Sequence, residues 1–167
     1  MAQSPIPALE TLRTPLGVWE DLTVSGEMAL EGVHGRTLEI IVDLEPIDSD
    51  RFGIEVHRDE SSGTRILYNM ARSQMLVSRS DTTDSGFISG FNPAFPAPAP
   101  LEENRLRLHI YVDESSVEVF GQDGQVAMTA LTFVDPQADG IAIYADHGSM
   151  KVHRLEIYAL SSIWPQS

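Results

Sequence analysis

The sequence predicts an all-β protein, namely a single antiparallel β-sandwich of the jelly-roll type with two stacked sheets. Short stretches that alternate apolar and polar residues recur along the chain, and turn residues separate them. No long segment with the 3.6-residue period of an amphipathic helix interrupts them. Short strands at this regular spacing are typical of sandwiches. The 167 residues suffice for one domain with a substantial core.

The predicted domain covers residues 18–164, after an N-terminal extension or linker at 1–17 and before a short tail at 165–167. The extension contains prolines and shows no periodicity. The first strand opens at Trp19 and Leu22. Further strands are predicted near residues 27–30, 38–45, 51–58, 66–70, 74–80, 106–112, 117–120, 125–134, 140–144 and 151–160.

A long connection is predicted at residues 81–100. It is rich in Asp, Ser, Gly and Pro, and its second half reads NPAFPAPAP. Proline has no backbone N–H to donate, so this half cannot pair as a central strand and favours an extended conformation. Connections of this length in compact domains are often lids or surface straps.

The clearest element is a hairpin at residues 106–123, LRLHIYVDESSVEVFGQD. Aliphatic residues alternate with polar or aromatic ones on both sides of a short polar turn. If Val112 faces Val117, then Tyr111 lies opposite Glu118 on one face of the sheet. One face of the hairpin is then aliphatic, and the other carries polar and aromatic side chains, which are the candidates for function.

Composition excludes several classes of function. The chain has 25 acidic against 11 basic side chains, a net charge of -14, which repels nucleic-acid phosphates and anionic lipid. There is no cysteine, so disulfides, thiol nucleophiles and cysteine-bound zinc are excluded. The five histidines lack metal-ligand spacing, and the acidic residues of 43–50 form no calcium loop, so they are interpreted as a solvated acidic rim. We predict no metal and no cofactor.

The hairpin resembles the C-terminal β-sandwich domain of glycoside hydrolase family 32, the invertases, levanases and inulinases. The matching residues are Asp113, then Ser116-Val117-Glu118-Val119-Phe120, and the Asp123-Gly124 turn. Arg79-Ser80 and Ser85-Gly86 in LVSRSDTTDSG are similar to another motif of that domain, and Gly140 and LEIYALSSIW fit as well. The resemblance extends over residues 36–164.

The catalytic machinery of the family lies in an N-terminal β-propeller, and its motifs are missing here. The sequence contains no Trp-Met-Asn-Asp-Pro-Asn, no Arg-Asp-Pro and no Glu-Cys. The resemblance therefore implies a domain without hydrolytic activity. It also extends to carbohydrate-binding module family 66, which is similar in fold and binds the terminal fructose of fructans such as levan.

Six side chains are candidates for contact with a sugar. Asp113 and Glu118 are carboxylates that can accept hydrogen bonds from vicinal hydroxyls. Tyr111 and His109 share the polar face, where a ring can pack on a sugar. The guanidinium of Arg79 can bind two hydroxyls. Asp146, followed by His147, ends a predicted strand at a loop.

Each candidate also has a structural interpretation. Asp113 could cap the hairpin turn, and Glu118 could form an ion pair with Arg79 inside the sandwich. Tyr111 and His109 could be ordinary cross-strand pairs, and Asp146 an ordinary turn residue. Three further aromatic residues are assigned to core or rim packing, namely Trp19, Tyr68 and Trp164.

Two functions from different classes remain. The first is a non-catalytic module that recognises terminal fructose of a fructan polysaccharide, levan first and inulin second, tethered to a parent glycosidase. The second is a structural accessory domain of a family 32 enzyme with no ligand of its own. The resemblance implies an extracellular location, although MAQSPIPALETLRTP has no apolar core of a signal peptide.

Overall fold

The computed structural model describes residues 2–3, 5–60, 62–80 and 94–162, and these residues form ten strands and two short 3₁₀ helices. The helices are Pro7–Leu12 and Met70–Arg72. The strands are β1 (Arg13–His34), β2 (Leu38–Pro46), β3 (Arg51–Arg58), β4 (Gly63–Asn69), β5 (Gln74–Ser80), β6 (Ala94–Pro98), β7 (Leu106–Asp113), β8 (Ser116–Gly121), β9 (Val126–Leu131) and β10 (Gly140–Leu160).

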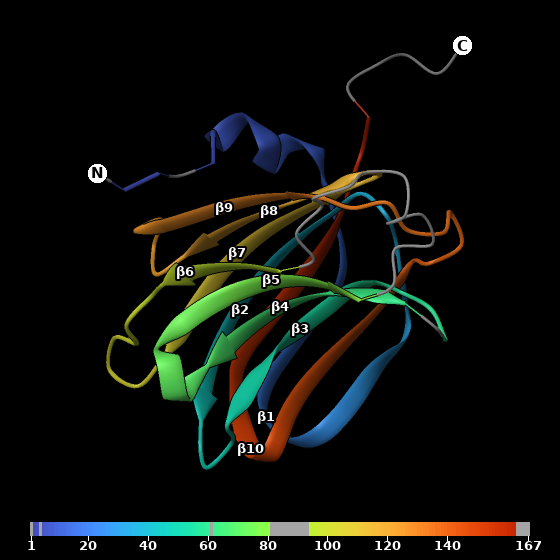
Figure 1. Ribbon diagram of the computed structural model, residues 1–167. Helices are drawn as coiled ribbons and strands as arrows, with labels where there is room; N and C mark the ends of the chain where they lie inside the picture. Colours follow the sequence, from blue (N-terminus) through green and yellow to red (C-terminus); the bar gives the residue numbers. More distant parts are fainter. Residues whose placement is uncertain (1, 4, 61, 81–93, 163–167) are drawn as a thin grey trace, which may run out of the picture.

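All strands belong to one antiparallel sheet in the order β6-β5-β4-β3-β10-β2-β7-β8-β9, and β1 pairs with β10 (Figure 1). The first part of β10 pairs with β3 and the second part with β2. The sheet therefore folds back on itself about β10, and its two ends, β6 and β9, contact each other. The predicted all-β, antiparallel architecture is confirmed, but the strands form one continuous sheet rather than two separate ones.

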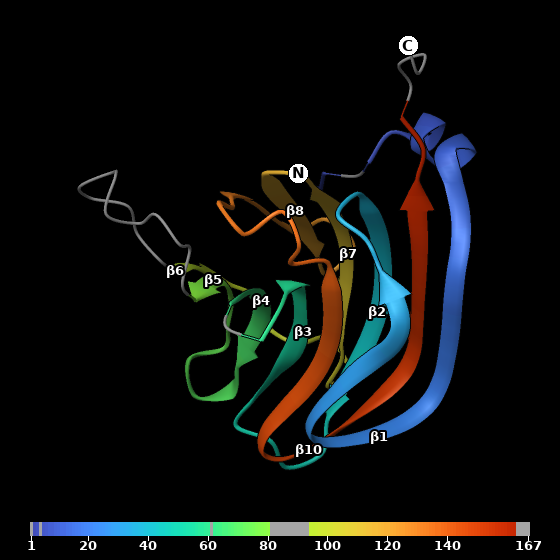
Figure 2. The same cartoon turned by 90° about the vertical axis from the view of Figure 1, so that its right-hand side faces the viewer.

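The strands predicted at residues 140–144 and 151–160 form one strand, β10, which bends between them. Between Ala145 and Ser149 the pairing with β1 is interrupted, and Gly26 of β1 has a φ of 72° at the same level. An interruption of this kind bends a strand without ending it. Both long strands curve around the edge of the molecule in this way (Figure 2).

The first strand begins before the predicted domain boundary. β1 begins at Arg13, which pairs with Leu160, so the last residues of the predicted extension belong to the sheet. The register shifts between Pro15 and Gly17, where a proline can be accommodated. The division between residues 17 and 18 thus falls within a strand. The predicted tail lies outside the described residues.

The proline-rich half of the predicted loop contains a strand. β6 pairs with β5 along one side only, at the end of the sheet. This edge position agrees with the expectation that prolines cannot occupy a central strand. Residues 81–93 of the predicted loop lie outside the described residues.

The core lies between the two halves of the folded sheet. Alternate residues of β2 and β7 point into it, as do Phe52 and Ile54 of β3, and all are almost fully buried. β7 and β8 pair in the predicted register, with Val112 opposite Val117 and Tyr111 opposite Glu118. The remaining side chains of the hairpin therefore lie on the outer face of the sheet.

Candidate functional site

A carboxylate that the sequence analysis missed organises the outer face of the hairpin. Glu39 of β2 is opposite Tyr111 and has no exposed surface. Its Oε1 accepts hydrogen bonds from the Tyr111 hydroxyl at 2.7 Å and from Arg13 Nη2 at 2.5 Å, and lies 2.5 Å from His109 Nε2. Nε of Arg13 donates to Oε2 at 2.5 Å. Tyr111 and His109 are thus held in fixed positions.

The electrostatics of this network follow from its burial. Burial alone raises the pKa of Glu39, but the hydrogen bonds from Arg13, Tyr111 and His109 outweigh it and lower the pKa to about 2. Burial and the neighbouring carboxylate raise the pKa of the Tyr111 hydroxyl. Glu39 is therefore ionised and Tyr111 neutral over the physiological range.

Three rings follow one another across β7 and β8. His109 and Tyr111 are stacked, with centroids 4.9 Å apart, and Phe120 meets Tyr111 edge-on with centroids 6.4 Å apart. Phe120 lies opposite His109 in the hairpin. These rings give the outer face an aromatic surface on which a sugar ring can pack.

An N-terminal strap, defined as Gln3 and residues 5–12, borders this face. The backbone N–H of Gln3 donates to the carbonyl of Gly124 at 2.9 Å, in the turn between β8 and β9. At its other end the strap leads into Arg13, which is bound to Glu39. Both ends of the strap are therefore fixed to the sheet.

The strap and the hairpin enclose a pocket of about 730 Å³, which we call the hairpin pocket. The sheet contributes Tyr111, Asp113 and Glu118 together with Phe120. The other wall is apolar and comes from the strap and the end of β10, including Ile6, Leu9, Leu12 and Leu160. This volume is in the range of small-molecule sites, which combine apolar walls with a few polar groups.

The two carboxylates of the pocket differ in their local roles. Asp113 accepts a hydrogen bond from the backbone N–H of Glu114 at 2.8 Å, so its predicted role as a turn cap is confirmed. Glu118 is exposed on the outer face of β8. The alternative ion pair between Glu118 and Arg79 is wrong, because the side chain of Glu118 points away from the interior.

Arg79 points between the two halves of the sheet rather than toward the hairpin pocket. It is 4% exposed, donates from Nη1 to the carbonyl of Leu131 at 2.5 Å, and lies over the ring of Phe95 at 4.8 Å from its centroid. Burial lowers the pKa of its guanidinium. Its position on β5 puts it on the same face as Met75 and Val77, as the alternation indicated.

Asp146 and His147 lie at the opposite end of the molecule from Asp113. The register places Asp146 beside Arg51, at the start of β3, whereas Asp113 is the last residue of β7, next to Val112, which pairs with Leu38. The carbonyl of Asp146 accepts from the N–H of Asp50 at 3.1 Å, and His147 Nδ1 lies 3.4 Å from Asp50 Oδ2. The structure does not bring Asp146 together with the hairpin residues.

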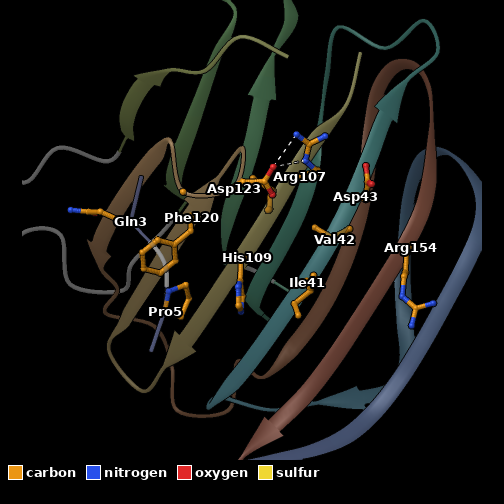
Figure 3. A pocket seen from close by; sticks show the side chains of 12 residues that line it. Gln3, Pro5, Ile41, Val42, Asp43, Arg107, His109, Phe120, Asp123 and Arg154 are labelled. Carbon is orange, nitrogen blue, oxygen red and sulfur yellow. Dashed lines mark hydrogen bonds and ion pairs between the residues drawn. The ribbon is translucent and has the colours of Figure 1, made fainter. Parts of the chain in front are cut away.

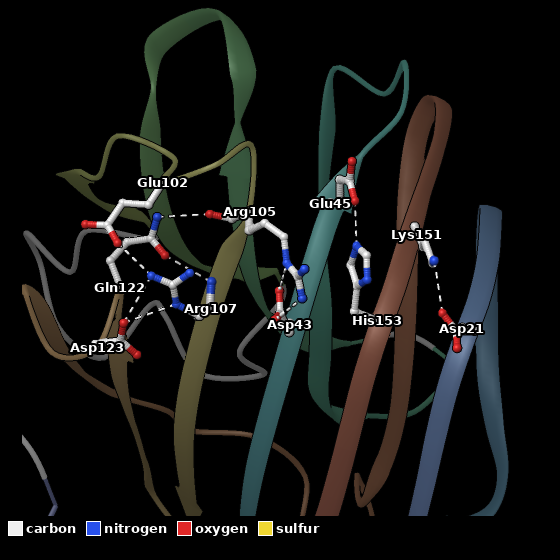
Figure 4. Close-up of polar contacts among 10 residues, drawn as sticks. All are labelled: Asp21, Asp43, Glu45, Glu102, Arg105, Arg107, Gln122, Asp123, Lys151 and His153. Atoms are coloured by element: carbon white, nitrogen blue, oxygen red, sulfur yellow. Dashed lines mark hydrogen bonds and ion pairs between the residues drawn. The ribbon is translucent and has the colours of Figure 1, made fainter.

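Other sequence-based interpretations concern packing and the acidic segment. Tyr68 is buried against Phe52, and Trp19 packs against the core, while Trp164 lies outside the described residues. In the predicted acidic rim, Asp43 pairs with Arg105, and Glu45 Oε2 lies 2.5 Å from His153 Nε2, so these two carboxylates are partly exposed and have partners (Figure 4). Within the described residues no cluster of metal-binding side chains is found and no helix is suited to cross a membrane.

The structure is an all-β domain with a pocket on the outer face of its sheet, and comparison with known proteins places it in a family. The profile described as "Glycosyl hydrolases family 32 C terminal" matches residues 8–159. The chain belongs to this family.

Two curated relatives are levanases. The levanase of Bacillus sp. (strain L7) is 37% identical over 98% of this chain and 18% of its own length. The levanase of Bacillus subtilis (strain 168) is 33% identical over 98% of this chain and 25% of its own length. The chain thus spans a quarter or less of these relatives.

Among solved structures, the exo-inulinase from Aspergillus awamori matches with a TM-score of 0.87 and 25% sequence identity. The match covers 98% of this chain and 33% of the exo-inulinase chain. Fructan 1-exohydrolase IIa from Cichorium intybus shares the fold, with a TM-score of 0.76 at 14% identity. The predicted resemblance to family 32 is therefore confirmed.

Proposed function

We propose that this chain is a non-catalytic domain of a fructan-degrading glycoside hydrolase and that its hairpin pocket binds the terminal fructose of a fructan, levan first and inulin second. The observation that supports this most strongly is that one pocket gathers Tyr111, Asp113 and Glu118. These side chains come from two strands and the turn between them. The names of the relatives, two levanases and an exo-inulinase, support fructan as the ligand class.

The pocket suits a neutral polyhydroxylated ring. An ionised carboxylate has about four acceptor positions, so the cap bond through Oδ1 leaves Asp113 able to accept from a hydroxyl. Glu118 supplies a second acceptor across the hairpin. The rings of Tyr111 and Phe120 offer apolar surface for the C–H face of the sugar.

The domain acts by attachment rather than by bond cleavage. Bound to polymer, it holds a tethered glycosidase domain close to its substrate and raises the effective concentration. We expect no release of fructose from levan, inulin or sucrose by the isolated chain. The net charge of -14 disfavours nucleic acid and membranes as partners. A relative named extracellular exo-inulinase, from Aspergillus niger, supports an extracellular location.

Replacement of Glu118 by glutamine tests the pocket. Because Glu118 is exposed and the glutamine keeps its size, we expect the fold to be retained. The loss of a charge-assisted hydrogen bond is expected to weaken fructose binding by about tenfold, measured by isothermal titration calorimetry.

Glu31→Gln is the matched control, because Glu31 is an exposed carboxylate of β1 outside the hairpin pocket. Its affinity for fructose is expected to equal that of the unmodified chain. The proposal fails if neither fructose nor levan gives heat at millimolar concentration, or if the two variants bind alike.

The second candidate is a structural domain that packs on the parent enzyme and binds no sugar. It is favoured by exposed apolar side chains on the edge strand β1 and the strap, with Val18 51% and Ile6 65% exposed. Such surface is often covered by another protein surface. If Val18→Ser weakens association with the parent catalytic domain in size-exclusion chromatography and no sugar binds, this candidate replaces the first.

A further inference from the structure

A second pocket adjoins the hairpin pocket on the same outer face, and the proposed function leaves it unused. It has a volume of about 460 Å³ and is lined by Ile41, His109, Arg107 and Asp123, among others (Figure 3). Pro5 of the strap and Phe120 of β8 line both pockets. Since they share these two residues, the pockets are neighbours, and we call the two together the outer groove.

The outer groove follows β7. Arg107 lines one end and Asp113 the other, and a strand rises about 3.4 Å per residue, so the groove extends over about 20 Å. The stacked rings of His109 and Tyr111 lie between these ends, beside Phe120. This length is several times the length of a single sugar ring.

The chemistry of the second pocket favours a neutral ligand. One of its two arginines, Arg107, donates from Nε to Asp123 Oδ2 at 3.1 Å and from Nη2 to Glu102 Oε2 at 2.6 Å. The other, Arg154, pairs with Glu20 and Glu156. The carboxylate of Asp43 pairs with Arg105 (Figure 4). Each arginine of the pocket is thus already paired with carboxylates, so no cation is left free to attract an anion, and fixed donors and acceptors lie beside apolar surface. A sugar hydroxyl can donate to such acceptors and accept from such donors.

We propose that the outer groove binds at least two consecutive fructosyl units, with the terminal unit in the hairpin pocket and the next one in the pocket formed by Ile41, His109, Arg107 and Asp123. The proposal rests on the proposed function and deepens it, because it turns a site for a chain end into a site for an oligosaccharide. Phe120, shared by both pockets, lies between the two units. The side chain of Asp123 is 71% exposed and accessible to hydroxyls of the second unit.

Calorimetry with fructose and with a levan-derived trisaccharide tests this. The trisaccharide is expected to bind about tenfold more tightly than fructose, a difference that corresponds to about 1.4 kcal/mol. Ile41→Trp should fill the second pocket, since Ile41 is half-buried on the outer face opposite His109. We expect it to abolish the advantage of the trisaccharide and to leave the affinity for fructose unchanged within about twofold.

Asp123→Asn is the second variant, and it reduces the trisaccharide advantage without adding volume. Its control is Asp50→Asn, a change of another exposed carboxylate, which lies 3.4 Å from His147 Nδ1 and lines neither pocket. The inference is overturned if fructose and trisaccharide bind equally, or if both second-pocket variants retain the full trisaccharide advantage. If fructose binds but the trisaccharide gains nothing, only this inference falls. If neither binds, the proposed function falls with it.

Discussion

Replacement of Glu39 by glutamine is expected to lower the free energy of unfolding at pH 7 by about 3 kcal/mol, because it removes the one carboxylate that serves a buried network. Glu39 has no exposed surface and binds Arg13, Tyr111 and His109. Without the charge of Glu39, Arg13 is left partly buried, with Glu10 at 3.9 Å as a weak ionic partner and the ring of Tyr158 at 5.0 Å from its guanidinium. Urea denaturation followed by tryptophan fluorescence measures the change.

The same network makes stability depend on pH in the acid range. The pKa of Glu39 is about 2 in the folded protein, against 4.5 for an unperturbed glutamate. A carboxyl with a lowered pKa stabilises the fold fully above its unfolded pKa, and this stabilisation is lost as the pH falls from 4.5 through about 2. A shift of this size corresponds to about 3 kcal/mol. The Glu39→Gln variant should lack this component of the acid dependence.

Glu45→Gln is the matched control for this prediction. Glu45 lies on the same face of β2 and pairs with His153, but it is partly exposed, with 36% of its side chain accessible. Partly exposed pairs contribute about 1 kcal/mol or less. Equal losses of stability in the two variants would contradict the special role of Glu39.

The sequence alone was sufficient to predict the hairpin and its register, because strict alternation leaves one arrangement that buries the aliphatic side chains. It did not identify Glu39, although this residue alternates with buried Leu38 and Ile40. The partner Arg13 lies in a segment without periodicity, and nothing in the local pattern shows that β1 begins there. A hydrogen-bond network between segments that are distant in the sequence depends on which strands pair. The alternation of residues within one strand does not contain that information.

The sequence places the end of a strand at Asp146, and the structure differs here for a related reason. The segment YADHGSM reads as a turn, yet β10 continues through it because β1 bends at the same level. Asp146 therefore lies far from the hairpin, at the opposite end of the strands. Glycine and polar residues mark both turns and interruptions within a strand, and only the neighbouring strand decides between them.

Gly53 illustrates a signal that the sequence does contain. A glycine within an otherwise alternating strand often marks a close approach of another backbone. Gly53 of β3 pairs with Leu67 of β4 on one side and with Tyr144 of β10 on the other. A Cβ atom at this position would collide with the carbonyl oxygen of Ile66, and a backbone atom within a sheet cannot move aside as a flexible side chain can.

Gly53→Ala is therefore expected to reduce the free energy of unfolding by about 3 kcal/mol, at the upper end of the cost of overpacking. Gly32→Ala is the control: Gly32 has a φ of 77°, which costs alanine about 1 kcal/mol, but no atom lies within 4 Å of the added methyl group. Urea denaturation of both variants separates collision from backbone strain. A Gly53→Ala variant as stable as Gly32→Ala would mean that β3 and β4 can separate slightly without loss, and the tight pairing at the centre of the folded sheet would then not be required for stability.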